Sequence, residues 1–66
     1  MPRKVREGVR DLYRAGFVLS RCKGSHRRFK NNSGSVSLTV SGHDGDDLHH
    51  YQEKEIRRAI EEVSNE

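Results

Sequence analysis

Three short strands and two turns are encoded in residues 17–41, which read FVLSRCKGSHRRFKNNSGSVSLTVS. The first six of these residues are β-prone, and Gly24-Ser25 then supplies a two-residue hairpin turn. A second turn signal follows at Asn31–Gly34, with a glycine where a positive φ is expected. Beyond it, apolar residues alternate with Ser and Thr, which is the period of a half-buried strand. The stretch therefore predicts an antiparallel meander with strands at residues 17–22, 26–30 and 36–41.

Apolar residues at helical spacing flank this meander on both sides. Before it, Pro2 suits a first helical turn and Gly16 suits the C-terminal cap of the same helix. After it, residues 42–50 are polar and acidic, as in a loop, and a closing helix follows. The positions that carry the helical period are Val5, Val9, Leu12 and Tyr13, and then Ile56, Ala59, Ile60 and Val63. The order α-β-β-β-α predicts one α+β domain over residues 1–66, with a three-stranded antiparallel sheet and two helices on one face, as in double-stranded-RNA-binding domains.

The net charge of +3 is divided unevenly along the chain. Residues 1–30 carry ten Lys or Arg and two acidic residues, whereas residues 31–66 carry three basic and eight acidic residues. The basic half predicts a surface for a polyanion, because neutralised phosphates release counterions and so favour binding. The acidic half could face a basic partner or keep the protein soluble.

Several classes of protein are excluded by composition. No apolar run approaches the roughly 20 residues that a membrane-spanning helix needs. The single cysteine, Cys22, cannot form an internal disulfide, and it is expected to be a half-buried strand residue. A lone thiol without a signal-peptide pattern predicts a cytoplasmic protein with no membrane contact.

A histidine directly after the first turn is the candidate for chemistry. RNA cleavage needs a base for the ribose 2′-OH, an acid for the leaving 5′-oxygen and positive charge beside the phosphorane. Histidine can be that base or acid near neutral pH, and Arg and Lys can stabilise the charge without a metal. If Phe29 packs inward, strand alternation places His26, Arg28 and Lys30 together on the exposed face. The candidate RNA-binding residues around His26 are Arg21, Lys23, Gly24, Ser25, Arg27, Arg28 and Lys30.

The loop after the meander offers a second cluster of polar side chains. Its members are His43, Asp44, Asp46, Asp47, His49 and His50. Aspartate and histidine can bind zinc or manganese, but this spacing lacks the regularity of a helical or finger-type metal site. The alternative is a solvated loop in which Asp46 or Asp47 accepts hydrogen bonds from free amides at the start of the last helix. We predict no metal and no cofactor, and His43 is a possible accessory residue at the RNA surface.

Short motifs along nearly the whole chain resemble the HicA family of toxins from toxin–antitoxin systems. They are Gly16-Phe17, Arg21, Lys23-Gly24-Ser25-His26, Phe29, Gly45-Asp46-Asp47, Tyr51-Gln52-Glu53-Lys54 and Ile56-Arg57-Arg58-Ala59-Ile60. The resemblance implies a double-stranded-RNA-binding-domain-like fold, metal-free cleavage of mRNA with His26 as catalytic residue, and neutralisation by a HicB-like antitoxin that covers the active site. Many members carry Val-Pro-x-His after the third strand, whereas this chain has Val40-Ser41-Gly42-His43, without the proline.

Three functions are consistent with this sequence pattern. The favoured hypothesis is a metal-independent endoribonuclease toxin with His26 as general acid or base. A non-catalytic RNA-binding module of the same fold would carry the same basic hairpin. A pure protein-interaction partner would gain stability for its small core from the bound protein.

Overall fold

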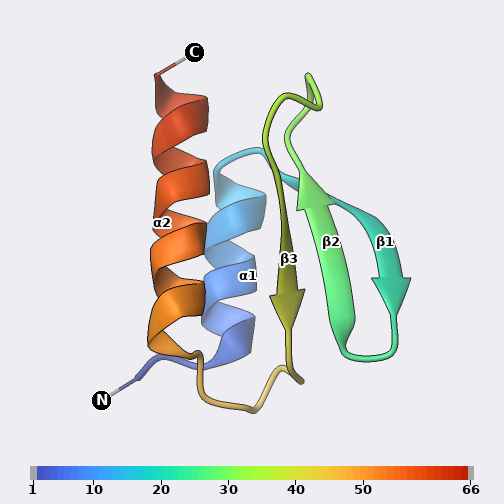
Figure 1. Ribbon diagram of the computed structural model, residues 1–66, viewed down its shortest axis with the longest axis vertical. Helices are drawn as coiled ribbons and strands as arrows, with labels where there is room; N and C mark the ends of the chain where they lie inside the picture. Colours follow the sequence, from blue (N-terminus) through green and yellow to red (C-terminus); the bar gives the residue numbers. More distant parts are fainter. Residues whose placement is uncertain (1, 66) are drawn as a thin grey trace.

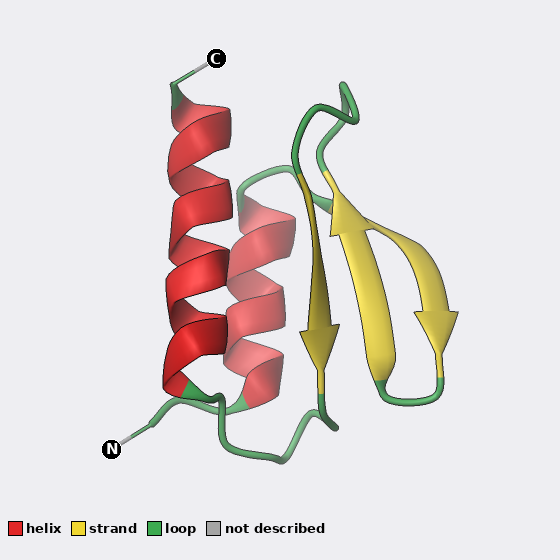
Figure 2. Cartoon of the chain, in the orientation of Figure 1, coloured by secondary structure: helices red, strands yellow, loops and turns green. Residues whose placement is uncertain are grey.

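The computed structural model describes residues 2–65 and shows two helices packed on one face of a three-stranded antiparallel sheet (Figures 1 and 2). Along the chain the elements are α1 (Val5–Arg14), β1 (Val18–Lys23), β2 (His26–Lys30), β3 (Ser37–Ser41) and α2 (His50–Ser64). The strand order is β1-β2-β3, so β2 is the central strand. The predicted α+β class and α-β-β-β-α order are confirmed. Of the predicted 1–66 domain, residues 1 and 66 lie outside the described part.

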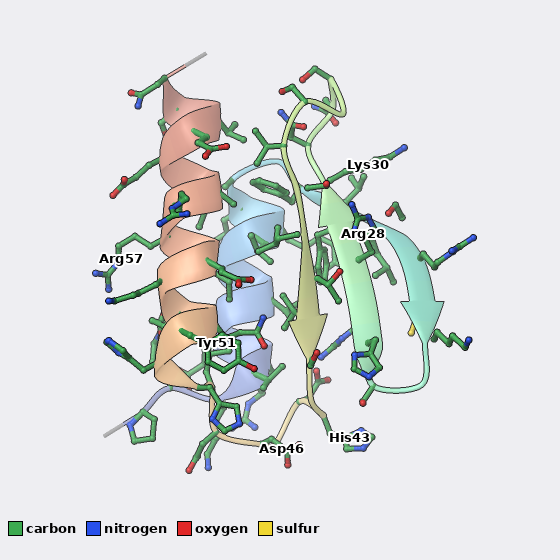
Figure 3. All side chains as sticks on the ribbon, viewed as in Figure 1. Arg28, Lys30, His43, Asp46, Tyr51 and Arg57 are labelled. Carbon is green, nitrogen blue, oxygen red and sulfur yellow. The ribbon has the colours of Figure 1, made fainter. Side chains whose placement is uncertain are left out.

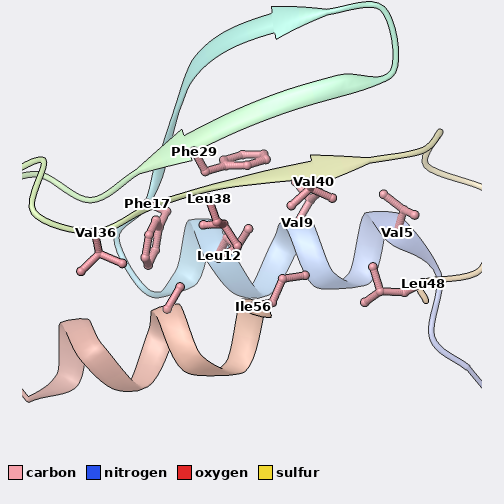
Figure 4. Packing of buried hydrophobic residues seen from close by; sticks show 11 residues of the cluster. Val5, Val9, Leu12, Phe17, Phe29, Val36, Leu38, Val40, Leu48 and Ile56 are labelled. Carbon is pink, nitrogen blue, oxygen red and sulfur yellow. The ribbon is translucent and has the colours of Figure 1, made fainter. Parts of the chain in front are cut away.

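The core lies between the two helices and the sheet, and among residues 2–65 it contains eleven buried hydrophobic residues (Figure 4). Phe29 of β2, Leu38 and Val40 of β3 and Val36 directly before β3 face inward, as the alternation predicts. Two side chains differ from the sequence-based expectation: Tyr13 is half exposed, and Leu48 of the loop is buried. The burial of Leu48 shows that the loop closes one end of the core.

Both ends of α1 are fixed by hydrogen bonds to groups outside the helix. At its C-terminal end Gly16 has φ 94°, the Gly16 amide donates to Tyr13 O at 3.1 Å and the Phe17 amide donates to Leu12 O at 2.9 Å. These two bonds form a Schellman motif, which confirms the predicted glycine cap. At the other end Pro2 precedes the helix instead of lying in its first turn, because α1 begins only at Val5.

The loop between β3 and α2 caps α1 rather than α2. The amide of Val5 donates to Asp46 O at 2.9 Å, and the amide of Arg6 donates to Asp44 O at 3.2 Å. The expectation that Asp46 or Asp47 caps the last helix is therefore wrong: α2 has His49 at its N-cap, with no side-chain hydrogen bond to the helix. The two carboxylates bind the His43 amide and the Lys4 ammonium instead.

Two further sequence expectations are tested by the described residues. Cys22 is exposed rather than half-buried, because β1 lies at the edge of the sheet and all its residues are exposed. Neither α1 nor α2 is long and apolar enough to cross a membrane.

Candidate nucleic-acid interface

The sheet face opposite the helices carries His26 and a group of cations. On β2, His26, Arg28 and Lys30 are exposed while Phe29 between them is fully buried. On β1, Lys23 lies opposite His26 and Arg21 lies opposite Arg28. The alternation of β2, confirmed by the buried Phe29, thus places four cations on the same sheet face as the imidazole. We call these five residues, Arg21, Lys23, His26, Arg28 and Lys30, the basic sheet face.

A β-bulge in β1 is what brings Arg21 and Lys23 to this face. In a regular strand Arg21 would share a face with Leu19, whose partner is the buried Phe29. The register shifts between Leu19 and Arg21, so that Arg21 becomes the partner of the outward Arg28. Residues directly opposite in an antiparallel pair point to the same side of the sheet. The bulge therefore places the side chains of Arg21 and Lys23 on the same sheet face as His26.

The imidazole of His26 is held by a hydroxyl of the neighbouring strand. Its Nδ1 lies 3.0 Å from Ser41 Oγ, and the two residues are cross-strand partners. The Ser41 amide donates to Gln52 Oε1 at 3.3 Å, and Gln52 Nε2 donates to Thr39 O at 2.9 Å. Gln52 is only 3% exposed, so α2 fixes the strand that holds the imidazole. In the described part of the chain no side chain engages Nε2, which remains open to a ligand.

Arg28 is held across β3 by two more hydroxyls. Its Nη1 donates to Thr39 Oγ1 at 3.3 Å, and its Nη2 donates to Ser37 Oγ at 3.0 Å. No carboxylate among residues 2–65 forms an ion pair with Arg28 or Lys30. Figure 3 shows both cations on the strand side of the molecule, away from α2. Their charge is therefore available to an anion.

Arg27 does not join the other predicted RNA contacts. It lies opposite the buried Val40 and two residues before Phe29 on the same strand, so its side chain leaves β2 on the helix side of the sheet. There its Nη2 lies 2.8 Å from Asp44 Oδ1. Arg27 therefore ties the central strand to the loop after β3, on the face opposite His26.

The turn before His26 and the predicted accessory His43 lie at one end of the sheet. Gly24 has φ 59°, which the first turn position of this hairpin needs and which L-residues rarely adopt. Ser25 O accepts the Gly42 amide at 3.1 Å, and this bond ties the turn to the end of β3. Gly24, Ser25 and His43 line one shallow depression of about 220 Å³, together with Arg27 and Asp44, which lie on the side of the sheet opposite His26. His43 thus lies beside the turn that precedes His26 (Figure 3).

The His and Asp side chains of residues 43–50 do not converge on a common point where a metal ion could bind. Among residues 2–65 no three His, Cys, Asp or Glu side chains are arranged so that they could hold a metal ion. Asp44 binds Arg27, and Asp47 binds Lys4 at 2.6 Å, a hydrogen bond that lowers the pKa of Asp47. These carboxylates fasten the loop to β2 and to the residue before α1.

Three hydroxyl residues and one amide were missed as site residues from the sequence. Ser37, Thr39 and Ser41 orient Arg28 and His26, and Gln52 fixes Ser41. A signal for the hydroxyls was present, because the period of 2 in residues 36–41 places all three on the face of His26. Gln52 belongs to the motif Tyr51–Lys54 noted above, but no role could be assigned to it from the sequence, because its partners are backbone atoms of another element.

The fold and this face define a small α+β protein with an uncovered basic sheet surface. A family model described as "HicA toxin of bacterial toxin-antitoxin" matches residues 5–61. The chain belongs to this family of toxins, and an antitoxin is therefore the partner that the family implies. A search of curated proteins found no match.

Proposed function

We propose that this toxin is a metal-independent endoribonuclease that uses His26 as general base or acid at the basic sheet face. The observation that carries the proposal is the 3.0 Å contact between His26 Nδ1 and Ser41 Oγ, which orients the ring and leaves Nε2 open. Geometry of this kind is what proton transfer to or from a bound ribose or phosphate ester requires.

The cations beside His26 would meet a further requirement of RNA cleavage, which is positive charge beside the phosphorane. Lys23 is its cross-strand partner on β1, and Arg28 lies two residues along β2 on the same face. A phosphate held between them would place its ribose 2′-OH near Nε2. Removal of the 2′-OH proton lets that oxygen attack phosphorus, while the 5′-oxygen leaves with a proton from an acid. The guanidinium and ammonium groups would stabilise the extra negative charge of the phosphorane.

His43 is the candidate for the second proton carrier. It lies at the same end of the sheet, next to the turn that precedes His26, in a depression that Arg27 of the opposite face also lines. The chain's other histidines, His49 and His50, lie at the start of α2, where His49 stacks on Tyr51. His50 therefore serves as a matched control of the same residue type.

The test compares His26→Ala, His43→Ala and His50→Ala. We expect His26→Ala to abolish growth arrest on expression and to slow RNA cleavage about 10²–10⁴-fold, while thermal unfolding stays unchanged. We expect a smaller decrease for His43→Ala and none for His50→Ala. Cleavage in excess chelator should equal that in buffer alone.

Two outcomes would contradict the proposal. Cleavage by His26→Ala at the wild-type rate would remove His26 from the chemistry. Binding of RNA by the wild-type protein without any cleavage products would favour the non-catalytic RNA-binding module.

A further inference from the structure

A groove on the helix side of the sheet is not used by the proposed chemistry. The two helices cover β3 and β2, whereas β1 projects past them (Figure 1). The inward side of β1 is therefore left open beside α1. Val9, Tyr13, Leu19, Asp44 and parts of four arginines line the resulting depression of about 400 Å³, which we call the α1–β1 groove.

The floor of this groove is apolar and partly exposed. Tyr13 is 51% exposed and Leu19 is 42% exposed, so two of the exposed large hydrophobic residues meet here. The ring of Tyr13 packs edge-on against Phe29, with the planes at 84° and the centroids 5.6 Å apart. An apolar floor of this kind gains free energy when another apolar group covers it.

The rim of the α1–β1 groove is formed by arginines. Arg6, Arg10 and Arg14 follow one another at intervals of four residues along α1, so they lie on one face of the helix. None of the three has an ion pair with another residue among positions 2–65. Like charges at this spacing destabilise a helix, and a cation in the first turn also opposes the helix dipole. Arg27 completes the rim, already paired with Asp44.

We infer that the α1–β1 groove docks an acidic amphipathic segment of a partner protein, with apolar side chains on its floor and carboxylates against the three free arginines. Arginine binds carboxylates in a bidentate manner, and the floor requires apolar partners as well as charge. Single-stranded nucleic acid is a poorer fit, because successive bases stack on several aromatic faces, whereas this groove offers one ring, Tyr13, which already packs against Phe29 beside the aliphatic Val9 and Leu19. The groove lies on the opposite side of the sheet from His26, so the inference does not rest on the proposed cleavage of RNA.

The probe is a fluorescein-labelled 15-residue peptide of Glu, Leu and Ala, with leucines at helical spacing. Its matched control replaces every Glu by Gln. Fluorescence anisotropy with the full-length protein should show binding of the acidic peptide and much weaker binding of the Gln peptide. The double variant Arg10→Gln/Arg14→Gln should weaken binding at least about tenfold, as loss of charged contacts at an interface does. Leu19→Ser should weaken it without a change of charge.

A control variant and a mapping experiment locate the peptide. The variant Arg28→Gln/Lys30→Gln makes the same change of charge on the basic sheet face and should alter peptide affinity less than about twofold. Amide chemical shifts of ¹⁵N-labelled protein should change along residues 6–19 with the peptide. Oligouridine should instead shift residues of β2 and β3. Circular dichroism of each variant checks that the fold is retained.

Three results would overturn the inference. Equal peptide affinity for the wild-type protein and Arg10→Gln/Arg14→Gln would show that the groove is not the docking surface. Oligouridine shifts along α1, lost in that variant, would make the groove a nucleic-acid interface. Self-association that only the groove variants abolish would make a second copy of the chain its occupant. None of these results depends on whether His26→Ala stops cleavage.

Discussion

At the scale of single residues, Ser41 connects the fold to the proposed chemistry. Its Oγ holds His26 Nδ1 at 3.0 Å, and its amide is bound by the buried Gln52. An imidazole that has lost this contact samples other rotamers, and only a fraction of them aim Nε2 at the substrate. Ser41 is therefore a positioning residue.

Ser41→Ala is expected to lower kcat roughly tenfold and to leave KM unchanged, because misorientation costs rate rather than binding. Steady-state cleavage of a short RNA gives both constants. Ser41→Thr retains the hydroxyl and should restore most of kcat. Ser64→Ala, which removes a hydroxyl bound to Ile60 O on α2, is the matched control. An unchanged kcat in Ser41→Ala would exclude the positioning role.

Arg27 shows what the sequence alone could not settle at this scale. Alternation with Phe29 already assigns Arg27 to the helix side, yet a run of basic residues in the sequence groups it with its neighbours. Its partner Asp44 lies in a loop beyond β3, and nothing in the local sequence links the two. Position on a strand was predictable here, whereas a long-range ion pair was not.

At the scale of elements, Gly8 is the point where α1 approaches α2 and the loop before it. A Cβ at residue 8 would lie 2.9 Å from Ile56 Cδ1 and 3.0 Å from Leu48 Cδ2. Ile56 is only 1% exposed and Leu48 only 4%, so neither side chain can move freely. The absence of a side chain at Gly8 therefore sets the spacing of the helices.

Gly8→Ala is expected to lower the free energy of unfolding by about 1 kcal/mol. Overpacking costs about 1–3 kcal/mol, and the better helix propensity of alanine returns up to about 1 kcal/mol. Gly45→Ala is the matched control, since a Cβ there has no neighbour within 4 Å. Urea unfolding measures both variants, and equal stability of Gly8→Ala and the wild-type protein would contradict the packing argument.

The start of α2 marks the limit of prediction for whole elements. The strands and the C-terminal end of α1 were predictable because alternation, turn glycines and a Schellman glycine mark them in the sequence, whereas α1 was expected to start at Pro2 and starts at Val5. The apolar period of the last helix begins at Ile56, but α2 begins at His50. Its first turn is anchored by Gln52 to the backbone of β3 and follows the buried Leu48. Polar side-chain to backbone bonds leave no periodic signal, so the anchoring of this first turn to β3 could not be predicted, although the polar loop over residues 42–50 placed the start of the helix to within one residue.

At the scale of the whole molecule, Arg3 fastens the N-terminal segment to both helices. Its guanidinium binds Asp11 of α1 and Glu53 of α2. The hydrogen bond from Arg3 is the main cause that lowers the pKa of Glu53, and burial opposes it. A carboxylate whose pKa is lowered by folding stabilises the protein above its unfolded pKa and loses that contribution as pH falls through the folded value.

Glu53→Gln is therefore expected to lower the free energy of unfolding at pH 7 by on the order of 1 kcal/mol. The difference from the wild-type protein should shrink as pH falls below the ordinary pKa of a glutamate, about 4.3, and vanish once pH is below the lowered pKa of folded Glu53. Thermal unfolding between pH 2 and 7 measures it. Glu55→Gln, a neighbour with no ion pair among residues 2–65, should show no such pH-dependent difference.

Four cations lie on the basic sheet face. The salt dependence of RNA binding therefore tests whether RNA binds at this face. Each phosphate contact on a single strand contributes a slope of about −0.7 to log affinity against log salt, so four cations predict about −3. Arg28→Gln should reduce the steepness by about 0.7, because one contact is lost. Arg57→Gln removes the same charge from the outer side of α2 (Figure 3) and should leave the slope unchanged. Equal slopes for the two variants would show that RNA responds to net charge and not to the sheet face that carries His26.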